Sequence, residues 1–385
     1  MTAEPFPFDE DESAAFGAAP DDPAEELRAL VALTLVPGVG PGRIRALLAR
    51  FGSAQAALHA PVAALVQVPG IGLQTARRIA AFDDWDAVDV QFERAERVGA
   101  TLIPAWDERF PPLLRQIYDP PALLWVRGER TPADDNAVAI VGTRRPTDYG
   151  LRTARQFAAA LAREGVTVVS GLAYGIDAAA HRGALEAGGR TLAVLGSGVD
   201  RIYPSRHERL ARAITAQGAL VSEFPLGAAP DAPNFPRRNR LISGLARAVL
   251  IVEAYETGGA LITARLALEQ NREVLAIPGA LHNPASAGTN RLIRDSLARL
   301  VCSPEDVLEA LGLGSAPTVP EPPPPPPLSG LERQLYDALE PEPIHIDVLC
   351  ERTGLDPSTA LVYLLQLEFK GLVRQLAGKQ FYRLQ

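Results

Sequence analysis

The sequence predicts an α/β fold: a doubly wound, Rossmann-like parallel sheet, preceded by an all-α helix-hairpin-helix (SAM-like) domain and followed by a winged helix. Three patterns carry this prediction. Short apolar segments alternate with amphipathic helical segments through the middle of the chain. Two glycine-rich turns that lead into helices precede that block, and three short helical segments with a terminal hairpin follow it. Buried strands joined by helices form parallel sheets, which bind ligands at the carboxyl ends of their strands.

Residues 1–23 are predicted to be a disordered acidic tail. A segment of one charge sign with little apolar content gains too little from burial to fold. We interpret it as a solvated tail, with docking of a basic partner as the alternative. The segment has no basic residue, and its acidic residues are Glu4, Asp9, Glu10, Asp11, Glu12, Asp21 and Asp22.

Residues 24–105 are predicted to form a helical domain with two helix-hairpin-helix motifs. The segments 36–44 and 68–76 each contain an apolar-Pro-Gly-apolar-Gly turn that leads into an amphipathic helix. Glycine allows the tight turn and leaves backbone N–H groups exposed at the helix start, where an anion can bind. The motif often holds a nucleic-acid backbone, so double-stranded DNA is a candidate partner here. Arginines and acidic residues balance in this domain, which leaves a structural or protein-docking role equally open.

Residues 106–312 are predicted to form the Rossmann-like core. Its strands are short and almost continuously apolar, as expected when both faces of a sheet are covered. Helices are expected at 148–163, from the segment after 175 through 181, at 208–217 and at 260–270. The expected strands are 137–141, 166–169, 191–195, 219–221, 248–252 and 273–277.

Residues 313–328 contain the run Pro322–Pro327, which predicts an extended polyproline linker. Residues 329–385 then show three helical segments and a hairpin, the pattern of a winged helix. Its third helix, at 356–370, starts at Asp356-Pro357 and is largely apolar. Helices that read bases in the major groove present Arg, Asn or Gln instead. We therefore favour a protein-docking role for this domain over DNA reading.

The bulk composition describes an ordinary globular protein without metal or disulfide chemistry. The chain has 385 residues, a net charge of −8, 47% hydrophobic residues and 22% charged residues. The two cysteines, Cys302 and Cys350, are far apart in sequence and fit a reducing compartment. There is no apolar run long enough for a membrane span and no secretory signal pattern, so we expect a cytoplasmic protein.

Small residues that suit an anion follow the predicted strands. Glycine lets the backbone approach a phosphate, hydroxyl groups donate hydrogen bonds, and the helix start behind each loop adds partial positive charge. One such loop alone is more simply explained by close packing. Taken together, the loops predict a long phosphate-binding groove. The candidate contacts are Gly142, Thr143, Arg144, Arg145, Ser170, Gly171, Gly196 and Ser197.

The segment 234–242 is the strongest local signal for nucleic acid. It places three arginines, two asparagines and one aromatic ring at the expected start of a helix, within an acidic chain. Arginine offers a planar donor fork that fits phosphate, and an aromatic face can stack on an unpaired base. The candidate contacts are Phe235, Arg237, Arg238, Asn239 and Arg240.

Several alternative chemistries are missing from the sequence. No G-x-G-x-x-G fingerprint follows the first strand, and no lysine precedes Lys370, which excludes a P-loop NTPase. No His/Cys cluster has metal-ligand spacing, so we expect neither a cofactor nor a metal ion. Asp177 and His181 could form an acid–base pair, although a structural hydrogen bond is the simpler interpretation. Glu223 and Glu253, at strand ends, could hold a sugar hydroxyl or orient an arginine.

These motifs together resemble the DNA processing protein A family (DprA, also called Smf). The resemblance rests on 139–150, 170–184, 194–204, 222–245 and 251–290. It implies a non-enzymatic, homodimeric protein of natural transformation that binds and protects incoming single-stranded DNA and loads a RecA-type recombinase. It also implies that the loop 142–144 and the segment 235–240 contact the strand.

Two rival functions remain at this stage. The first is a nucleotide-processing enzyme of the phosphoribohydrolase type on a related Rossmann-like fold. The Pro-Gly-Gly-x-Gly-Thr loop of such enzymes is missing, and Thr257-Gly258-Gly259-Ala260 matches it only in part. The second is a sequence-specific regulator that uses the winged helix.

Overall fold

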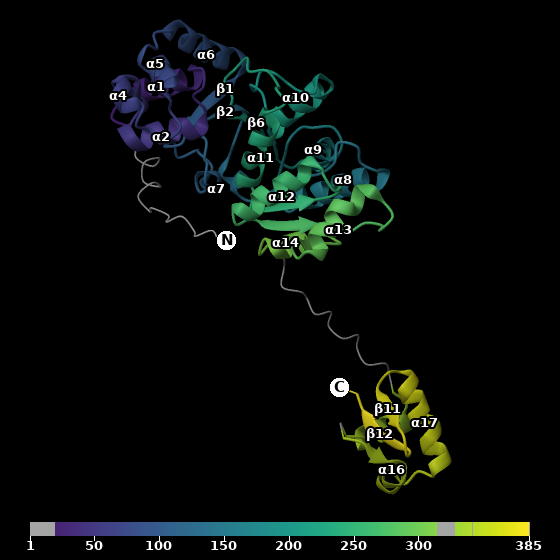
Figure 1. Ribbon diagram of the computed structural model, residues 1–385. Helices are drawn as coiled ribbons and strands as arrows, with labels where there is room; N and C mark the ends of the chain where they lie inside the picture. Colours follow the sequence, from purple (N-terminus) through teal and green to yellow (C-terminus); the bar gives the residue numbers. More distant parts are fainter. Residues whose placement is uncertain (1–19, 314–327, 341, 385) are drawn as a thin grey trace. The chain divides into compact units, whose positions relative to one another are not determined.

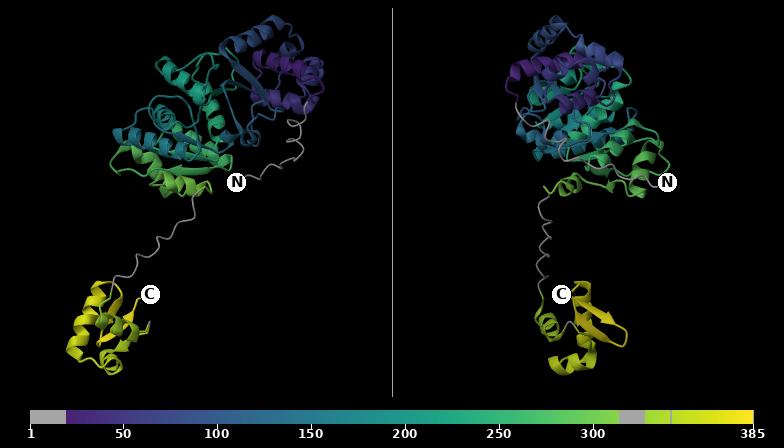
Figure 2. Two further views of the ribbon diagram at one scale, coloured as in Figure 1. Left: turned by 180° about the vertical axis from the view of Figure 1, so that it is seen from behind. Right: turned by 60° about the vertical axis from the view of Figure 1, so that its left-hand side comes forward.

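The computed structural model describes residues 20–313, 328–340 and 342–384. These residues fall into two compact units, divided between Gly314 and Ser315 (Figures 1 and 2). Each unit is described separately below. The expected acidic tail and proline-rich linker lie almost wholly outside the described residues.

The first unit is built on one nine-stranded sheet in the order β1-β2-β6-β5-β4-β3-β7-β8-β9. The seven strands β6-β5-β4-β3-β7-β8-β9 are parallel to one another, whereas β2 is antiparallel to both β6 and β1. The order reverses at β3, which lies between β4 and β7. The strand bounds are β1 Ala100–Pro104, β2 Leu123–Gly128, β3 Ala137–Val141, β4 Thr167–Ser170, β5 Thr191–Val194, β6 Ala219–Ser222, β7 Ala248–Ile251, β8 Glu273–Ala276 and β9 Arg299–Leu300.

Both faces of this sheet are covered, as the almost continuously apolar strands predicted. Along β3, Ala137, Ala139 and Val141 belong to one apolar core, and Val138 and Ile140 belong to another. Successive side chains of a strand point to opposite faces, so the two cores lie on opposite sides of the sheet. The helices of this region are α8 Asp148–Arg163, α9 Ile176–Glu186, α10 Glu208–Gln217, α11 Asn234–Gly244, α12 Gly259–Glu269, α13 Ala287–Arg294 and α14 Pro304–Ala310.

The N-terminal helices contain the two expected helix-hairpin-helix turns. Gly38 and Gly70 have φ values of 90° and 78°, a backbone conformation that glycine adopts without strain. The two turns lie close together, since the Arg78 guanidinium donates to the Pro37 carbonyl over 3.2 Å. The helices, purple to blue in Figure 1, are α1 Pro23–Leu35, α2 Pro41–Phe51, α3 Ala54–Leu58, α4 Val62–Leu65, α5 Leu73–Ala80 and α6 Trp85–Val98.

Strands β1 and β2 were not anticipated. Residues 100–104 had been grouped with the helical domain, but they pair with β2 and so extend the core sheet. The helices are also fixed to the core by Gln91 on α6, which donates to the Leu226 carbonyl and accepts from the Leu226 N–H at 3.2 and 2.9 Å. Helical domain and core therefore form one continuous body.

The second unit has the expected winged-helix fold. Its helices are α15 Gly330–Ala338, α16 Ile346–Thr353 and α17 Pro357–Phe369, and its sheet has the order β10-β12-β11. Strands β11 Val373–Leu376 and β12 Gln380–Arg383 form the hairpin, and the short β10 Ile344–His345 adds a third strand. Asp356 caps α17 through the N–H groups of Ser358 and Thr359.

Candidate functional site

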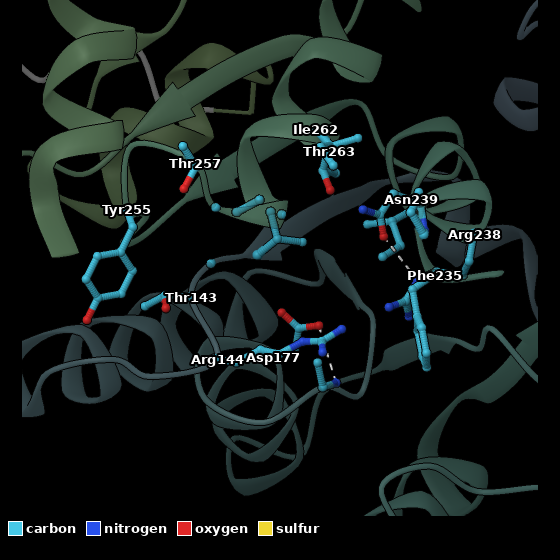
Figure 3. Close-up of a pocket in the computed structure, with 18 of the residues that line it drawn as sticks. Thr143, Arg144, Asp177, Phe235, Arg238, Asn239, Tyr255, Thr257, Ile262 and Thr263 are labelled. Atoms are coloured by element: carbon cyan, nitrogen blue, oxygen red, sulfur yellow. Dashed lines mark hydrogen bonds between the residues drawn. The ribbon is translucent and has the colours of Figure 1, made fainter. Parts of the chain in front are cut away.

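An open groove of about 680 Å³ lies at the carboxyl ends of β3, β4 and β7 (Figure 3). This is the point where the strand order reverses, which is where doubly wound sheets bind ligands. Thr143, Tyr255 and Thr257 lie on one side of the view, and Phe235 and Asn239 lie on the other. The groove thus joins the loop after β3 to the N-terminal half of α11, which the sequence had linked only by residue type.

The loop after β3 supplies two exposed cations. Arg144 and Arg145 are exposed to solvent, and no described residue forms an ion pair with either guanidinium. The loop itself is well fixed, because the Thr143 N–H donates to the Glu253 carbonyl over 2.8 Å and Gly142 packs closely against Ile176. Glu253 accepts hydrogen bonds from Thr147 at the start of α8, so it holds the loop and has no free carboxylate for a sugar.

Phe235 presents a half-buried ring beside these cations. The Arg144 guanidinium carbon lies 5.5 Å from the centre of the Phe235 ring, within cation–π range. The ring also lies against Gly196 at the end of β5, where a Cβ would come within 3.1 Å of the ring. Gly196 therefore serves the site by leaving space for Phe235. We refer to Arg144, Arg145 and Phe235 as the rim of the groove.

Arg238 lines the groove but is 4% exposed, and its guanidinium is bonded to the protein. It donates to the Gly171 carbonyl over 2.7 Å and to the Val194 carbonyl. Burial lowers the pKa of Arg238 to about 10, against the opposing attraction of Asp177. Gly171 packs directly on this guanidinium, where a side chain would not fit. We had expected Arg238 to contact phosphate; the structure shows it holding the ends of β4 and β5 together.

Asp177 and His181, on α9, are buried beside Arg238 and do not bond each other. Asp177 accepts from the N–H groups of Gly171 and Ala173 at 3.2 and 3.3 Å. Burial raises the Asp177 pKa, while Arg238 and these two hydrogen bonds act in the opposite direction. Burial lowers the pKa of His181 to about 3, so the imidazole is neutral near neutral pH. We call Asp177 and Arg238, which line the groove, together with the fully buried His181 on the same helix as Asp177, the floor of the groove.

The other arginines of the segment differ from one another. Arg240 is 9% exposed and forms ion pairs with Glu223 and with Asp119, the latter at 3.4 Å. Burial raises the pKa of Glu223, and Arg240 opposes that shift. Arg237 is exposed and lies over the Phe224 ring at 5.8 Å. Arg240 therefore acts as a structural counter-ion, and Arg237 keeps a solvent-exposed guanidinium.

The two predicted serine contacts are also internal. The Ser170 hydroxyl donates to the Ile140 carbonyl over 2.6 Å, and the Ser197 hydroxyl donates to the Arg201 carbonyl over 2.7 Å. Both residues are at most 2% exposed, so neither hydroxyl is available on the surface of the groove. Asn239 lines the groove and accepts from the Arg238 Nε over 3.2 Å, which leaves its amide NH₂ as a donor.

The sequence identified only part of the wall formed by β7 and α12. Tyr255, Thr257 and Thr263 line the groove together with the glycines at the start of α12. The N-cap residue Gly258 makes no side-chain capping bond. Backbone N–H groups at such a helix start are donors for an anion. In the sequence, the 257–260 loop is one of the glycine-rich strand-end loops that predict the phosphate-binding groove, and it also matches in part the loop of the rival enzyme.

Two absences apply to the described parts of the chain. Over residues 20–313, 328–340 and 342–384, no helix has the length and apolar content to cross a membrane. Over the same ranges, no group of three or more His, Cys, Asp or Glu side chains is arranged to hold a metal ion.

The fold and the groove define a Rossmann-like α/β protein with a cationic and aromatic binding groove, joined to a helix-hairpin-helix tandem and a winged helix. A family model described as DNA recombination-mediator protein A matches residues 101–312. Models of a SAM-like helix-hairpin-helix tandem and of the DprA winged helix domain match residues 30–82 and 319–379. The chain belongs to the DNA recombination-mediator protein A family, also called DprA or Smf.

Individual relatives agree with this assignment. Protein Smf of Escherichia coli (strain K12) is 42% identical over 324 residues, which cover 82% of this chain and 86% of that protein. The X-ray structure of DNA processing protein A from Streptococcus pneumoniae has a TM-score of 0.64 and 32% identity, covering 73% of this chain and 95% of that one. The structure of DNA processing protein A from Helicobacter pylori, a study of its single-stranded DNA binding mode, has a TM-score of 0.50 and 30% identity, covering 55% of this chain and 95% of that one.

Proposed function

We propose that this protein binds single-stranded DNA along the groove and delivers it to a RecA-type recombinase, without turning over nucleotides. The observation that carries the proposal is the contact of Arg144 with the Phe235 ring at the mouth of the groove. It places a phosphate-binding cation next to a ring that can stack on a base. A strand that crosses this point meets both with adjacent parts of one nucleotide unit.

The same chemistry explains why a single strand would be preferred. Stacking on Phe235 requires an unpaired base with an exposed face. Contacts to phosphates do not depend on base identity, so binding tolerates any sequence. The N–H groups at the start of α12 and the amide of Asn239 add donors that suit a backbone crossing the groove. Of the predicted contacts, we keep Gly142, Thr143, Arg144, Arg145, Phe235, Arg237 and Asn239 as ligand contacts.

The remaining predicted contacts support the groove indirectly. Gly171, Gly196, Ser170, Ser197, Arg238 and Arg240 hold the strand ends, the ring and the loops in place. We propose them as positioning residues. Precise placement of the contacting groups matters because loosely held side chains lose conformational entropy when the ligand binds.

Family membership supports the finer parts of the proposal. The Helicobacter pylori relative is described by its single-stranded DNA binding mode, and the matched family is named for mediating recombination. On this basis we propose a cytoplasmic homodimer that acts in natural transformation. The helix-hairpin-helix turns and the winged helix remain candidates for double-stranded DNA or protein contacts.

The test compares the affinity of the full chain for an oligothymidine and for a duplex of equal length, at two salt concentrations. We expect tighter binding of the single strand, with affinity that falls steeply as salt rises. Equal affinity for both forms, or binding that does not respond to salt, would contradict the proposal. Incubation with free nucleotides tests the rival enzyme: release of a base or a phosphate would overturn the non-enzymatic assignment.

A further inference from the structure

A second exposed aromatic ring lies beside Phe235, outside the residues that line the groove. Tyr203 is 47% exposed, and its ring centre lies 5.7 Å from that of Phe235, with an angle of 45° between the planes. This spacing is within the range of packed aromatic pairs. The two rings come from separate segments, since Phe235 is on α11 and Tyr203 follows β5.

The loop that carries Tyr203 is held from several sides. The Ser197 hydroxyl donates to the Arg201 carbonyl over 2.7 Å, and Asp200 accepts from the Gly227 N–H over 2.8 Å. Ile202 packs on the apolar core, and Pro204 is buried. These contacts fix the backbone on both sides of Tyr203, so its ring is positioned before any ligand arrives.

The side chain of Tyr203 contributes little to the packing of the protein. Its hydroxyl forms no hydrogen bond within the described ranges of the chain, and nearly half of its surface faces solvent. A tyrosine that only covered Phe235 would be expected to bury more of its own ring. Tyr203 instead extends the rim. The Arg144 guanidinium lies 5.5 Å from the centre of the Phe235 ring, and the centre of the Tyr203 ring lies 5.7 Å from that of Phe235.

We propose that Tyr203 and Phe235 form a two-ring platform on which neighbouring bases of a single strand stack, one base on each ring. The two rings already touch, so a base does not insert between them. Tyr203 offers its exposed face, and a base that stacks on Phe235 takes the place over the ring that the Arg144 guanidinium occupies in the free protein. The strand then leaves the groove across Phe235 toward the end of β5. This inference rests on the proposed binding of single-stranded DNA. It adds Tyr203 as a binding residue and gives the path by which the strand leaves the groove.

The test measures affinity of full-length Tyr203→Ala and Tyr203→Phe for an oligothymidine and for the same strand made abasic in its interior. Stacking contributes about 1–3 kcal/mol per base, so Tyr203→Ala should weaken oligothymidine binding roughly 5- to 150-fold. Tyr203→Phe should bind like the parent, because the ring is retained. On the abasic strand, all three proteins should bind equally, because no base is left to stack.

A matched control is Phe369→Ala, which removes an exposed aromatic ring from the winged helix. Any change in affinity that Phe369→Ala causes should be the same for the oligothymidine and for the abasic strand. The slope of log affinity against log salt should also stay the same in Tyr203→Ala, because the ring touches no phosphate. Denaturant midpoints equal to that of the parent would show that each variant is folded.

The outcomes separate this inference from the proposed function. If Arg144→Ala weakens binding while Tyr203→Ala binds like the parent, the platform is disproved and the groove stands. If neither variant changes affinity for the oligothymidine, the groove itself is disproved as the binding site. A loss in Tyr203→Ala that persists on the abasic strand would show that Tyr203 only positions its neighbours, and would also overturn the platform.

Discussion

The rim and the floor of the groove both contain arginine, but the arginines have different roles. On the rim, Arg144 and Arg145 are exposed and carry no ion-pair partner among the described residues. On the floor, Arg238 is almost fully buried, and its guanidinium donates hydrogen bonds to two backbone carbonyls. An arginine in the rim remains able to bind a ligand, whereas one in the floor connects strands. Enrichment in arginine therefore marks the region of a site, and burial decides which arginine has which task.

The largest expected effect is the loss of the floor arginine. Arg238→Ala should lower the free energy of unfolding by about 3–5 kcal/mol, because the buried Gly171 and Val194 carbonyls each lose their donor and the buried Asp177 loses a nearby positive charge. Denaturant unfolding measures this value. The neighbouring Arg237→Ala is the matched control and should change stability by less than about 0.5 kcal/mol, since Arg237 is exposed. An Arg238→Ala protein with unchanged stability and lost DNA binding would place Arg238 in the rim.

The floor should also make the protein sensitive to acid. The Thr191 hydroxyl donates to Val168, so its oxygen accepts from His181 Nδ1, and Nε2 has no partner among the described residues. In the folded protein the pKa of His181 is about 3, so the imidazole stays neutral down to low pH. In the unfolded chain the same histidine takes up a proton below a pH of about 6.5. Stability is therefore fully present above that pH and is lost as the pH falls, by about 1.4 kcal/mol per unit.

His181→Asn tests this pH dependence, because asparagine can donate to Thr191 but does not titrate. Between pH 7.5 and pH 5, the parent should lose about 2 kcal/mol more stability than the variant. Other groups titrate in both proteins and cancel in the difference. Parallel stability curves for parent and variant would show that His181 takes up its proton in the folded state.

Removal of the rim aromatic should affect binding and leave stability nearly unchanged. Phe235→Ala should cost about 1–3 kcal/mol of single-stranded DNA affinity if one base stacks on the ring. Because stacking involves no counter-ion release, this loss should be the same at low and at high salt. Titrations at two salt concentrations measure it. A loss that shrinks at high salt would mean that the variant has displaced Arg144.

The smallest expected effect is the loss of one rim charge. Arg144→Ala should weaken binding to a similar extent for every sequence and reduce the salt slope by about one, as expected for one phosphate contact. Arg212→Ala, an exposed arginine on α10, is the control and should change neither affinity nor slope. An unchanged slope in Arg144→Ala would show that its guanidinium stacks on Phe235 without touching a phosphate.

The sequence predicted the central fold well because its strands are buried on both faces. The expected strand 137–141 and the helices 148–163 and 208–217 have the bounds found in the structure. The prediction missed β2, although its apolar run at 122–126 is as long as that of β3, because no helix pattern follows it and it pairs antiparallel with β6 and β1. No periodic pattern distinguishes such a run from a loop that crosses the core.

The candidate site was predicted at the level of loops and not of side chains. The helical period separates the arginines only in part, because Arg238 lies three and four residues before the buried Leu241 and Ile242, while Arg237 also lies four residues before Leu241. The partners of Arg240 could not be found in this way, because Asp119 and Glu223 come from distant segments. The contact between Phe235 and Tyr203 likewise depends on tertiary packing.

The pairing of β1 with β2 has a practical consequence for dissecting the protein. A chain shortened to begin at residue 106 would lose β1 and leave one edge of β2 unpaired. That edge would carry the side chains of Leu123, Leu124 and Trp125, which are almost fully buried in the intact protein. Open, apolar sheet edges recruit other chains and aggregate. The smallest soluble form of the Rossmann-like core should therefore begin before residue 100.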